Sequence, residues 1–301
     1  MAGLKELRTR IESIKSTQKI TSAMKMVAAA RLRKAQMLTE SSAAYSDSIA
    51  KILSRAAAEI KSKKADKNAP ALPQLMQCRE NAHKYLLVVF TSDRGLCGSY
   101  NANVAKAAVQ RFNELKQAGC EVKVMCIGRK GRDIICRTHP EAVSAVLDGI
   151  ARKGADYTEA SIIAEQLCRA YQSGDFDVCE VVYSRFHSAI NREIISERFL
   201  PIEFSQTAAA EDMLVNGAAY EYEPTPTGVI EGLLFNYLKS EFFAYIINSQ
   251  ASEQGARMTS MDNATRNAKD MISKLTLKYN RMRQTSITTE LIEIIAGAEA
   301  L

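Results

Sequence analysis

Two long stretches of the chain lack the residues that break helices. Residues 4–69 contain neither proline nor glycine, and residues 227–301 contain no proline. Proline interrupts the hydrogen bonding of a helix interior and glycine weakens it, so both stretches can remain helical over their whole length. A helix of about 60 residues is on the order of 90 Å long, several times the length of an ordinary globular helix. We therefore predict one very long helix at each end of the chain.

Both stretches also carry a seam of apolar and small residues that step alternately by three and four positions. In the C-terminal stretch the seam consists of Met258, Met261, Thr265, Ala268, Ile272, Leu275, Tyr279 and Met282. In the N-terminal stretch it consists of Leu4, Leu7, Ile11 and Ile14, followed by the polar or small residues Gln18, Thr21 and Ala28. This spacing is typical of a coiled coil, and it predicts that the two terminal helices pair as a long antiparallel coiled coil. Two ordinary core helices of a bundle are the alternative interpretation.

The middle of the chain has a different pattern, in which short apolar runs alternate with amphipathic segments. Strands are expected at residues 83–91, 121–128, 177–190 and 193–204, and helices at 101–118 and 158–173. This order predicts an α/β fold, a Rossmann-like α/β head domain with a partly parallel sheet that ends in a hairpin. We expect three segments along the chain: an N-terminal helix at 1–68, the head domain at 69–225 and a C-terminal helix at 226–301.

Charge and composition narrow the classes of function. The chain has 301 residues, of which 47% are hydrophobic, so it can bury a core and is not a disordered protein. Its net charge of +6 is concentrated near the start, where residues 1–40 hold nine basic and three acidic residues. A basic helix favours an acidic partner, which can be nucleic acid, anionic lipid or an acidic protein surface. No apolar run reaches the length of about 18 residues that a membrane span requires.

The cysteines and histidines form no recognisable site in the sequence. There are seven cysteines, an odd number, without a C-x-x-C pair, and three scattered histidines. Disulfide frameworks and zinc sites use paired, regularly spaced residues. We therefore expect reduced thiols, no metal site and no cofactor.

One glycine-containing turn could carry chemistry. Residues 93–99 (DRGLCGS) follow the first predicted strand, where α/β proteins often bind phosphate. The turn lacks both phosphate-binding glycine patterns, and so does the basic turn at residues 128–131. Cys97 has no histidine near it in the sequence that could activate it as a nucleophile. We interpret both turns as connections, predict no catalytic residue, and expect an interaction protein.

Four segments carry a resemblance to a known family. They are residues 18–36 (QKITSAMKMVAAARLRKAQ), 92–101 (SDRGLCGSYN), 252–284, which begins SEQGARM, and 287–298 (ITTELIEIIAGA). All four resemble the gamma subunits of F-type ATP synthases. The similarity runs from one end of the chain to the other.

The resemblance implies a central rotor shaft, the central stalk of a rotary motor, with one copy in each complex. In this family the coiled coil lies inside a hexamer of alternating alpha and beta subunits. The head, with an epsilon-type subunit, sits on a ring of membrane c subunits that proton flow turns. ATP chemistry belongs to the beta subunits, so this chain would be non-catalytic. It would be a peripheral protein on the cytoplasmic face of a bacterial inner membrane, or alternatively on the matrix face of the mitochondrial inner membrane.

The resemblance also implies three contact regions. Residues expected to face an acidic loop of the beta subunit are Met24, Lys25, Arg31 and Arg33. Residues expected at the upper contact between rotor and stator are Arg283, Gln284, Thr288 and Glu290. Tyr222 and Glu223 are expected in the foot that contacts the membrane ring.

Two functions from other classes compete with this interpretation. A nucleic-acid-binding coiled coil would explain the basic helix, but it calls for aromatic or arginine-rich contacts that the seam lacks. A small α/β enzyme with helical arms would need a phosphate-binding or catalytic motif. We therefore expect protein partners and no nucleic acid.

Overall fold

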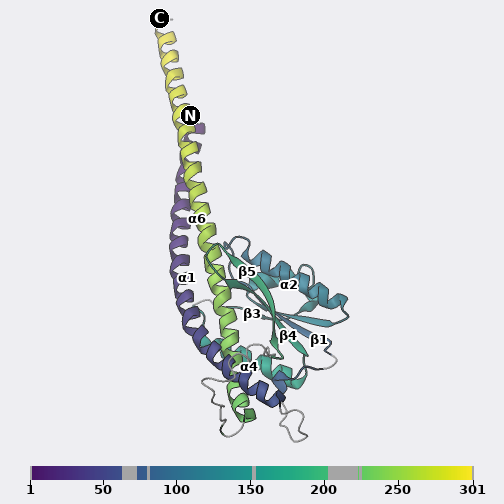
Figure 1. The fold of residues 1–301 in the computed structure, drawn as a ribbon. Helices are drawn as coiled ribbons and strands as arrows, with labels where there is room; N and C mark the ends of the chain where they lie inside the picture. Colours follow the sequence, from purple (N-terminus) through teal and green to yellow (C-terminus); the bar gives the residue numbers. More distant parts are fainter. Residues whose placement is uncertain are drawn as a thin grey trace. The chain divides into compact units, whose positions relative to one another are not determined.

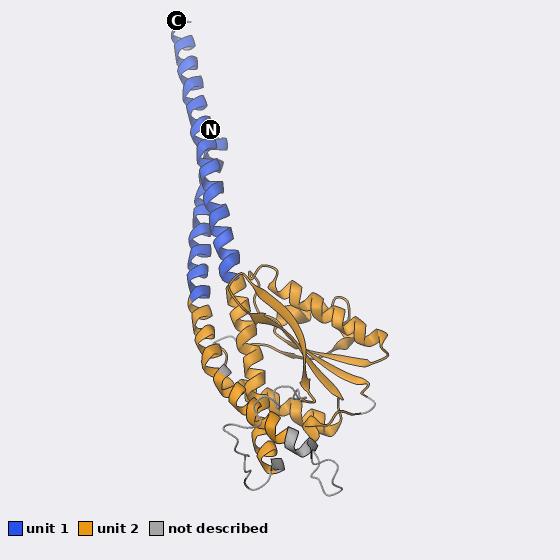
Figure 2. Ribbon diagram, viewed as in Figure 1, with its two compact units in different colours: residues 1–29, 257–301 blue, residues 30–256 orange. Residues whose placement is uncertain are grey.

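The computed structural model describes residues 2–62, 73–79, 82–150, 154–202, 223 and 226–299 (Figure 1). Its elements, in chain order, are α1 (Ala2–Ser62), η2 (Gln74–Met76), β1 (Lys84–Phe90), α2 (Tyr100–Gln117), β2 (Glu121–Ile127), α3 (Arg129–Ile135), η3 (Pro140–Ala142), β3 (Val143–Leu147), α4 (Tyr157–Ser173), β4 (Val178–Phe186), β5 (Arg192–Leu200) and α6 (Pro226–Glu299). The chain separates into two compact units, coloured in Figure 2. Unit 1 comprises Met1–Ala29 and Arg257–Leu301, and unit 2 comprises Ala30–Ala256.

Unit 1 is an antiparallel pair formed by the first part of α1 and the last part of α6 (Figure 2). The hydroxyls of Thr21 and Thr265 are 2.8 Å apart across the pair. Nearer the start of α1, a Cβ added at Gly3 would lie 3.2 Å from the terminal methyl of Met282. Residues with higher numbers on α6 therefore face residues with lower numbers on α1. This confirms the predicted antiparallel arrangement.

The predicted seam lies between the two helices. Seam positions that are buried or half-buried are Leu4, Leu7, Ile11, Ile14, Gln18, Thr21 and Ala28 on α1, and Met258, Met261, Thr265, Ala268, Ile272, Leu275 and Tyr279 on α6. Met282, the last predicted position, is exposed. Beyond it, every described side chain of α6 except the half-buried Ser286 is exposed as well. The C-terminal helix therefore continues past the end of its partner.

Unit 2 is built on a five-stranded sheet with the order β3-β2-β1-β4-β5. The first four strands are parallel, and β5 runs antiparallel to β4. Strand order reverses between β1 and β4, as it does in Rossmann-like sheets. These observations confirm the predicted α/β head with its partly parallel sheet and final hairpin.

Helices cover the sheet of unit 2 on both faces. On one face, Val89 of β1 packs in a buried cluster with Val104 and Phe112 of α2. On the other face, Phe90 of β1 contacts α6, with ring centroids 5.5 Å from Phe242 and 6.3 Å from Tyr245. The part of α6 that belongs to unit 2 therefore forms part of the hydrophobic core on this face of the sheet.

The structure differs from the sequence-based expectation in two short elements. Helix α3, of seven residues, and strand β3, of five, lie in segments for which no element was predicted. Both are too short for a clear periodicity, and β3 pairs along β2 at the edge of the sheet. The sequence also predicts a linker at residues 61–73 and a connection at 206–219; residues 63–72 and all of 206–219 lie outside the described residues.

The boundary between the two compact units cuts across both long helices. The expected division of the chain into three segments, at 1–68, 69–225 and 226–301, therefore stays a prediction. Among the helices that the structure describes, none combines the length and the apolar character needed to cross a membrane.

Candidate functional site

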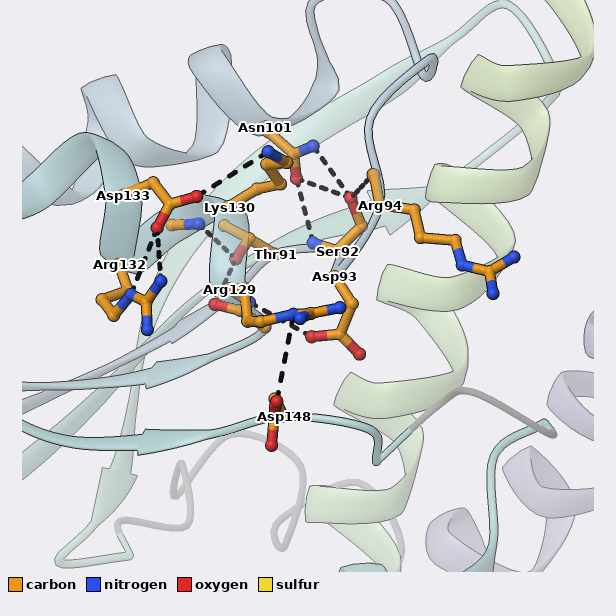
Figure 3. Close-up of polar contacts among 12 residues, drawn as sticks. Thr91, Ser92, Asp93, Arg94, Asn101, Arg129, Lys130, Arg132, Asp133 and Asp148 are labelled. Atoms are coloured by element: carbon orange, nitrogen blue, oxygen red, sulfur yellow. Dashed lines mark hydrogen bonds and ion pairs between the residues drawn. The ribbon is translucent and has the colours of Figure 1, made fainter.

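The carboxyl edge of the sheet is where a Rossmann-like fold would bind a nucleotide. Strand β1 ends there at Phe90, and the turn at residues 93–99 leads into α2 (Figure 3). Loops after β2 and β3 reach the same edge, because these strands run parallel to β1. The hydrogen bonds of this edge show what it can bind.

Asp93 links the three loops of the edge. Its carboxylate accepts hydrogen bonds from the backbone N–H groups of Arg129, at 3.2 Å, and Gly149, at 2.9 Å. These donors follow β2 and β3, respectively. Phosphate sites depend on backbone N–H groups that point at the ligand. In this chain the carboxylate of Asp93 accepts two such backbone N–H groups.

The side chain of Asn101 occupies the start of α2 and, like Asp93, is hydrogen-bonded to groups of the protein. Its side-chain oxygen accepts the backbone N–H of Ser92 at 2.9 Å, and its amide nitrogen donates to the Ser92 hydroxyl at 2.8 Å. The amide also lies 3.2 Å from the sulfur of Cys97. All three side chains are buried. The helix start is therefore packed with protein groups, and the interpretation of this turn as a connection stays a prediction.

Three basic residues of the same edge, Arg129, Lys130 and Arg132, lie near acidic ones (Figure 3). Arg129 lies 3.9 Å from Asp148, and Arg132 lies 2.7 Å from Asp133. Lys130 also approaches Asp133, at 3.7 Å. The hydrogen bond from Arg132 lowers the pKa of Asp133. These two carboxylates offset part of the positive charge that a bound phosphate would need.

Several of the thiols are buried and unreactive. All seven cysteines are reduced, and Cys97 is buried. Burial raises the pKa values of Cys126 and Cys168 to about 12, which keeps both thiols protonated at neutral pH. Within the described part of the chain, no group of three or more metal-ligating side chains could hold an ion.

The residues predicted to face the acidic loop of the beta subunit, here called the lower set, are divided between the two units. In unit 1, Met24 is half-buried and Lys25 forms an ion pair with Asp262 of α6 at 2.5 Å. The hydrogen bond from Lys25 lowers the pKa of Asp262. In unit 2, Arg31 and Arg33 are exposed. Sequence reasoning did not find Asp262, because the pairing depends on the register of two helices far apart in the chain.

The upper set lies together on the unpaired end of α6. Arg283, Gln284, Thr288 and Glu290 are all exposed. Thr288 donates its hydroxyl hydrogen to the carbonyl oxygen of Gln284 at 2.9 Å, one helical turn earlier. This bond leaves the side-chain amide of Gln284 available to an outside partner. Of the two residues expected in the foot, Glu223 is exposed and Tyr222 lies outside the described residues.

A cluster of carboxylates in unit 2 was not predicted. Glu197 of β5 accepts hydrogen bonds from Tyr183 and Arg185 of β4, both at 3.1 Å. Glu241 of α6 lies near Glu197 and near Asp47 of α1. Burial, reinforced by these two carboxylates, raises the pKa of Glu241 to about 7. The available sequence signal was an acidic residue, Glu241, among the apolar positions of the segment 228–248, which also contains Glu231.

Glu241 is expected to make the stability of the chain fall as the pH rises from about 4.5 to about 7. In this window the folded chain retains a proton that the unfolded chain has released, so rising pH favours unfolding. The decline should reach about 1–3 kcal/mol. Chemical denaturation across this pH range should show a flatter profile for Glu241→Gln than for the unaltered chain. Glu231→Gln, which alters an exposed carboxylate on the same helix, should retain the slope. Parallel profiles for all three proteins would contradict this assignment.

Comparisons with known proteins agree with the geometry. The protein-family model described as ATP synthase matches residues 3–301. The ATP synthase gamma chain of Rhodospirillum rubrum is 44% identical over 306 residues, and that of Erythrobacter litoralis is 42% identical over 301 residues. Each of these alignments covers 100% of both chains.

Solved structures show the same fold. A chain from the central stalk and c-ring structure of the Tetrahymena thermophila mitochondrial ATP synthase has a TM-score of 0.58 at 25% identity, with 81% of this chain and 99% of that chain covered. A chain from the Euglena gracilis mitochondrial ATP synthase, in rotational state 3, has a TM-score of 0.67 at 17% identity, with 99% and 94% covered. This chain belongs to the family of ATP synthase gamma chains.

Proposed function

We propose that this chain is the central shaft that couples rotation of a membrane c-ring to ATP synthesis and hydrolysis in a hexamer of alpha and beta subunits. The observation that carries the proposal is the form of unit 1. It is a two-helix coiled coil from which the last turns of α6 extend with exposed side chains on all sides. A helix end of this kind has its surface available to a surrounding protein.

The charge of unit 1 supports a partner with an acidic surface. Between residues 257 and 283, α6 carries seven basic and two acidic residues. From residue 284 onward it carries three acidic residues and no basic one. The paired part of α6 is thus basic, while residues 291–295 near its end are mainly apolar, with Leu291 and Ile295 exposed. A basic segment attracts acidic stator loops, and an apolar end slides more readily in a sleeve of apolar side chains than a charged end would.

The lower contact with the beta subunit would involve Met24, Lys25, Arg31 and Arg33. The ion pair of Lys25 with Asp262 offsets part of its charge, so Arg31 and Arg33 are the stronger candidates for an acidic loop. Exposed ion pairs are individually weak, typically about 0–1 kcal/mol. Such contacts can guide the rotor without holding it at one angle.

The other partners follow from the same role. The foot would contact the c-ring through Tyr222 and Glu223, together with an epsilon-type subunit. The chain would therefore lie peripherally on the cytoplasmic face of a bacterial inner membrane. The matrix face of a mitochondrial inner membrane is the alternative, and the bacterial relatives favour the first location.

Replacement of Gln284 and Thr288 together by leucine tests the upper contact. These residues are one turn apart on an exposed face, and the loss of about 1 kcal/mol for each hydrogen bond should slow ATP hydrolysis by the assembled complex about fivefold or more. Assembly should be unaffected, because neither side chain packs against α1. The measurement is steady-state ATP turnover alongside the subunit ratio of the purified complex.

The control for this test is the replacement of Thr285 and Thr289 by leucine. These two residues are also exposed and one turn apart, and Thr289 donates its hydroxyl hydrogen to the carbonyl oxygen of Thr285 at 3.0 Å. Their face is rotated by about 100° around the helix. Equal slowing by both double variants would show that no particular face of α6 makes the contact. A purified chain that fails to join alpha and beta subunits would contradict the shaft function itself.

A further inference from the structure

One face of α6 is hydrogen-bonded to the end of strand β4 within unit 2. Ser252, which is fully buried, donates its hydroxyl hydrogen to the carbonyl oxygen of Ser184 at 2.9 Å. One turn earlier, the side-chain oxygen of Asn248 accepts the backbone N–H of Phe186 at 3.3 Å. Residues four apart lie on the same side of a helix, so both bonds connect one stripe of α6 to the backbone of β4.

Gly255 continues this stripe by one turn. A Cβ added at this position would lie 3.3 Å from the ring of Phe186 and 3.4 Å from the Cα of Ala189. Its φ is not in the left-handed region, so backbone conformation does not explain the glycine. The close approach of α6 to the β4–β5 hairpin explains it instead.

The opposite side of α6 is also bonded to backbone. Gln250 is buried, and its side-chain oxygen accepts the backbone N–H of Ala155 at 3.1 Å. At 3.6 residues per turn, Gln250 and Ser252 point about 160° apart around the helix. Two segments distant in the sequence, β4 and the approach to α4, therefore bond to α6 from nearly opposite directions.

The direction of these bonds matters mechanically. Apolar packing has little directional preference, so a helix held by packing alone can roll against a sheet at small cost. A hydrogen bond weakens steeply when its geometry is distorted, and these acceptors and donors belong to the backbone of the head. Bonds on two opposite sides resist rolling in either direction.

We propose that Asn248, Gln250, Ser252 and Gly255, here called the 248–255 junction, fix the rotational setting of α6 against the head, so that torque passes between head and coiled coil. The inference rests on the proposed shaft function. It assigns these residues a positioning role, distinct from the contacts with the stator.

The test is the torsional stiffness of the assembled enzyme. With the hexamer immobilised and a bead attached to the head, the variance of the bead angle at a catalytic pause measures the stiffness between head and hexamer. In the double variant Gln250→Leu/Ser252→Ala, this variance should rise about twofold or more, because two of the directional bonds are absent. The single variant Ser252→Ala should fall between the double variant and the unaltered enzyme.

Ser249→Ala provides a matched control on the same helix. Its hydroxyl is buried like that of Ser252, but among the described residues it has no hydrogen-bond partner. The control should leave the bead variance unchanged, while the double variant should also reduce proton pumping per ATP hydrolysed in membrane vesicles. ATP hydrolysis by the hexamer should continue.

Two results would overturn the proposal: an unchanged variance in a fully assembled double variant, or equal softening by Ser249→Ala. Failure of the unaltered enzyme to rotate the bead would instead refute the shaft function. The two failures are therefore distinguishable in the same apparatus.

Discussion

Gly128→Ala is expected to destabilise the head by about 3–5 kcal/mol, the sum of backbone strain and steric overlap. Gly128 has a φ of +98°, in the region that side chains rarely adopt. A Cβ at this position would lie 2.2 Å from the carbonyl oxygen of Thr91, far inside any van der Waals contact. Because that oxygen belongs to the backbone at the end of β1, the overlap can be relieved only by moving the strand ends apart.

Urea denaturation followed by circular dichroism measures this loss. Gly119→Ala is the control, since Gly119 has a similar φ of +81° but nothing within 4 Å of an added Cβ. It should cost only about 1 kcal/mol, from conformational strain alone. Similar losses for the two variants would mean that the contact with Thr91 is not responsible.

The effect of Gly128→Ala should extend through the loops at this edge. Thr91 also accepts the backbone N–H of Gly131 through its hydroxyl at 2.8 Å, at the start of α3. Separation of Gly128 from Thr91 would disturb this bond and the neighbouring contacts of Asp93. The edge that holds a nucleotide in other Rossmann-like proteins is here used to hold the loops to one another.

The large elements of the fold could be predicted because each has a long or repeated local signal. The absence of proline and glycine predicted both terminal helices, and the alternating steps of three and four predicted which side chains lie between them. Strand β3 gave no such signal. Its five residues include Ser144 and Ala145, and its position depends on pairing with β2 rather than on its own composition.

The contact regions were predicted from the resemblance, while their internal partners were not. Lys25 and Asp262 are separated by 237 positions, and only the register of the coiled coil brings them together. The same holds for Glu241, whose pKa is raised by burial and, to a smaller extent, by carboxylates of β5 and α1. Such pairs are set by tertiary packing, which a pattern along one chain does not specify.

Arg111→Met is expected to cost about 2–4 kcal/mol of unfolding free energy, because it leaves a buried carboxylate unpaired. Arg111 of α2 forms two hydrogen bonds with Glu180 of β4, at 2.7 and 2.8 Å. The side chain of Glu180 is only 9% exposed, and these bonds raise the pKa of Arg111. Arg132→Met breaks a comparably short but exposed pair with Asp133 and should change stability little.

The double variant Arg111→Met/Glu180→Leu separates the cost of an unpaired charge from the value of the pair. Two apolar residues of similar size leave no buried charge, so the double variant should recover most of the stability that Arg111→Met loses. Denaturation of the four proteins of this cycle measures the coupling between the residues. Additive losses would show that the two side chains act independently. A recovery would show that burying the two paired charges adds little net stability. The pair would then mainly fix how α2 sits on β4, the strand whose end also bonds to α6.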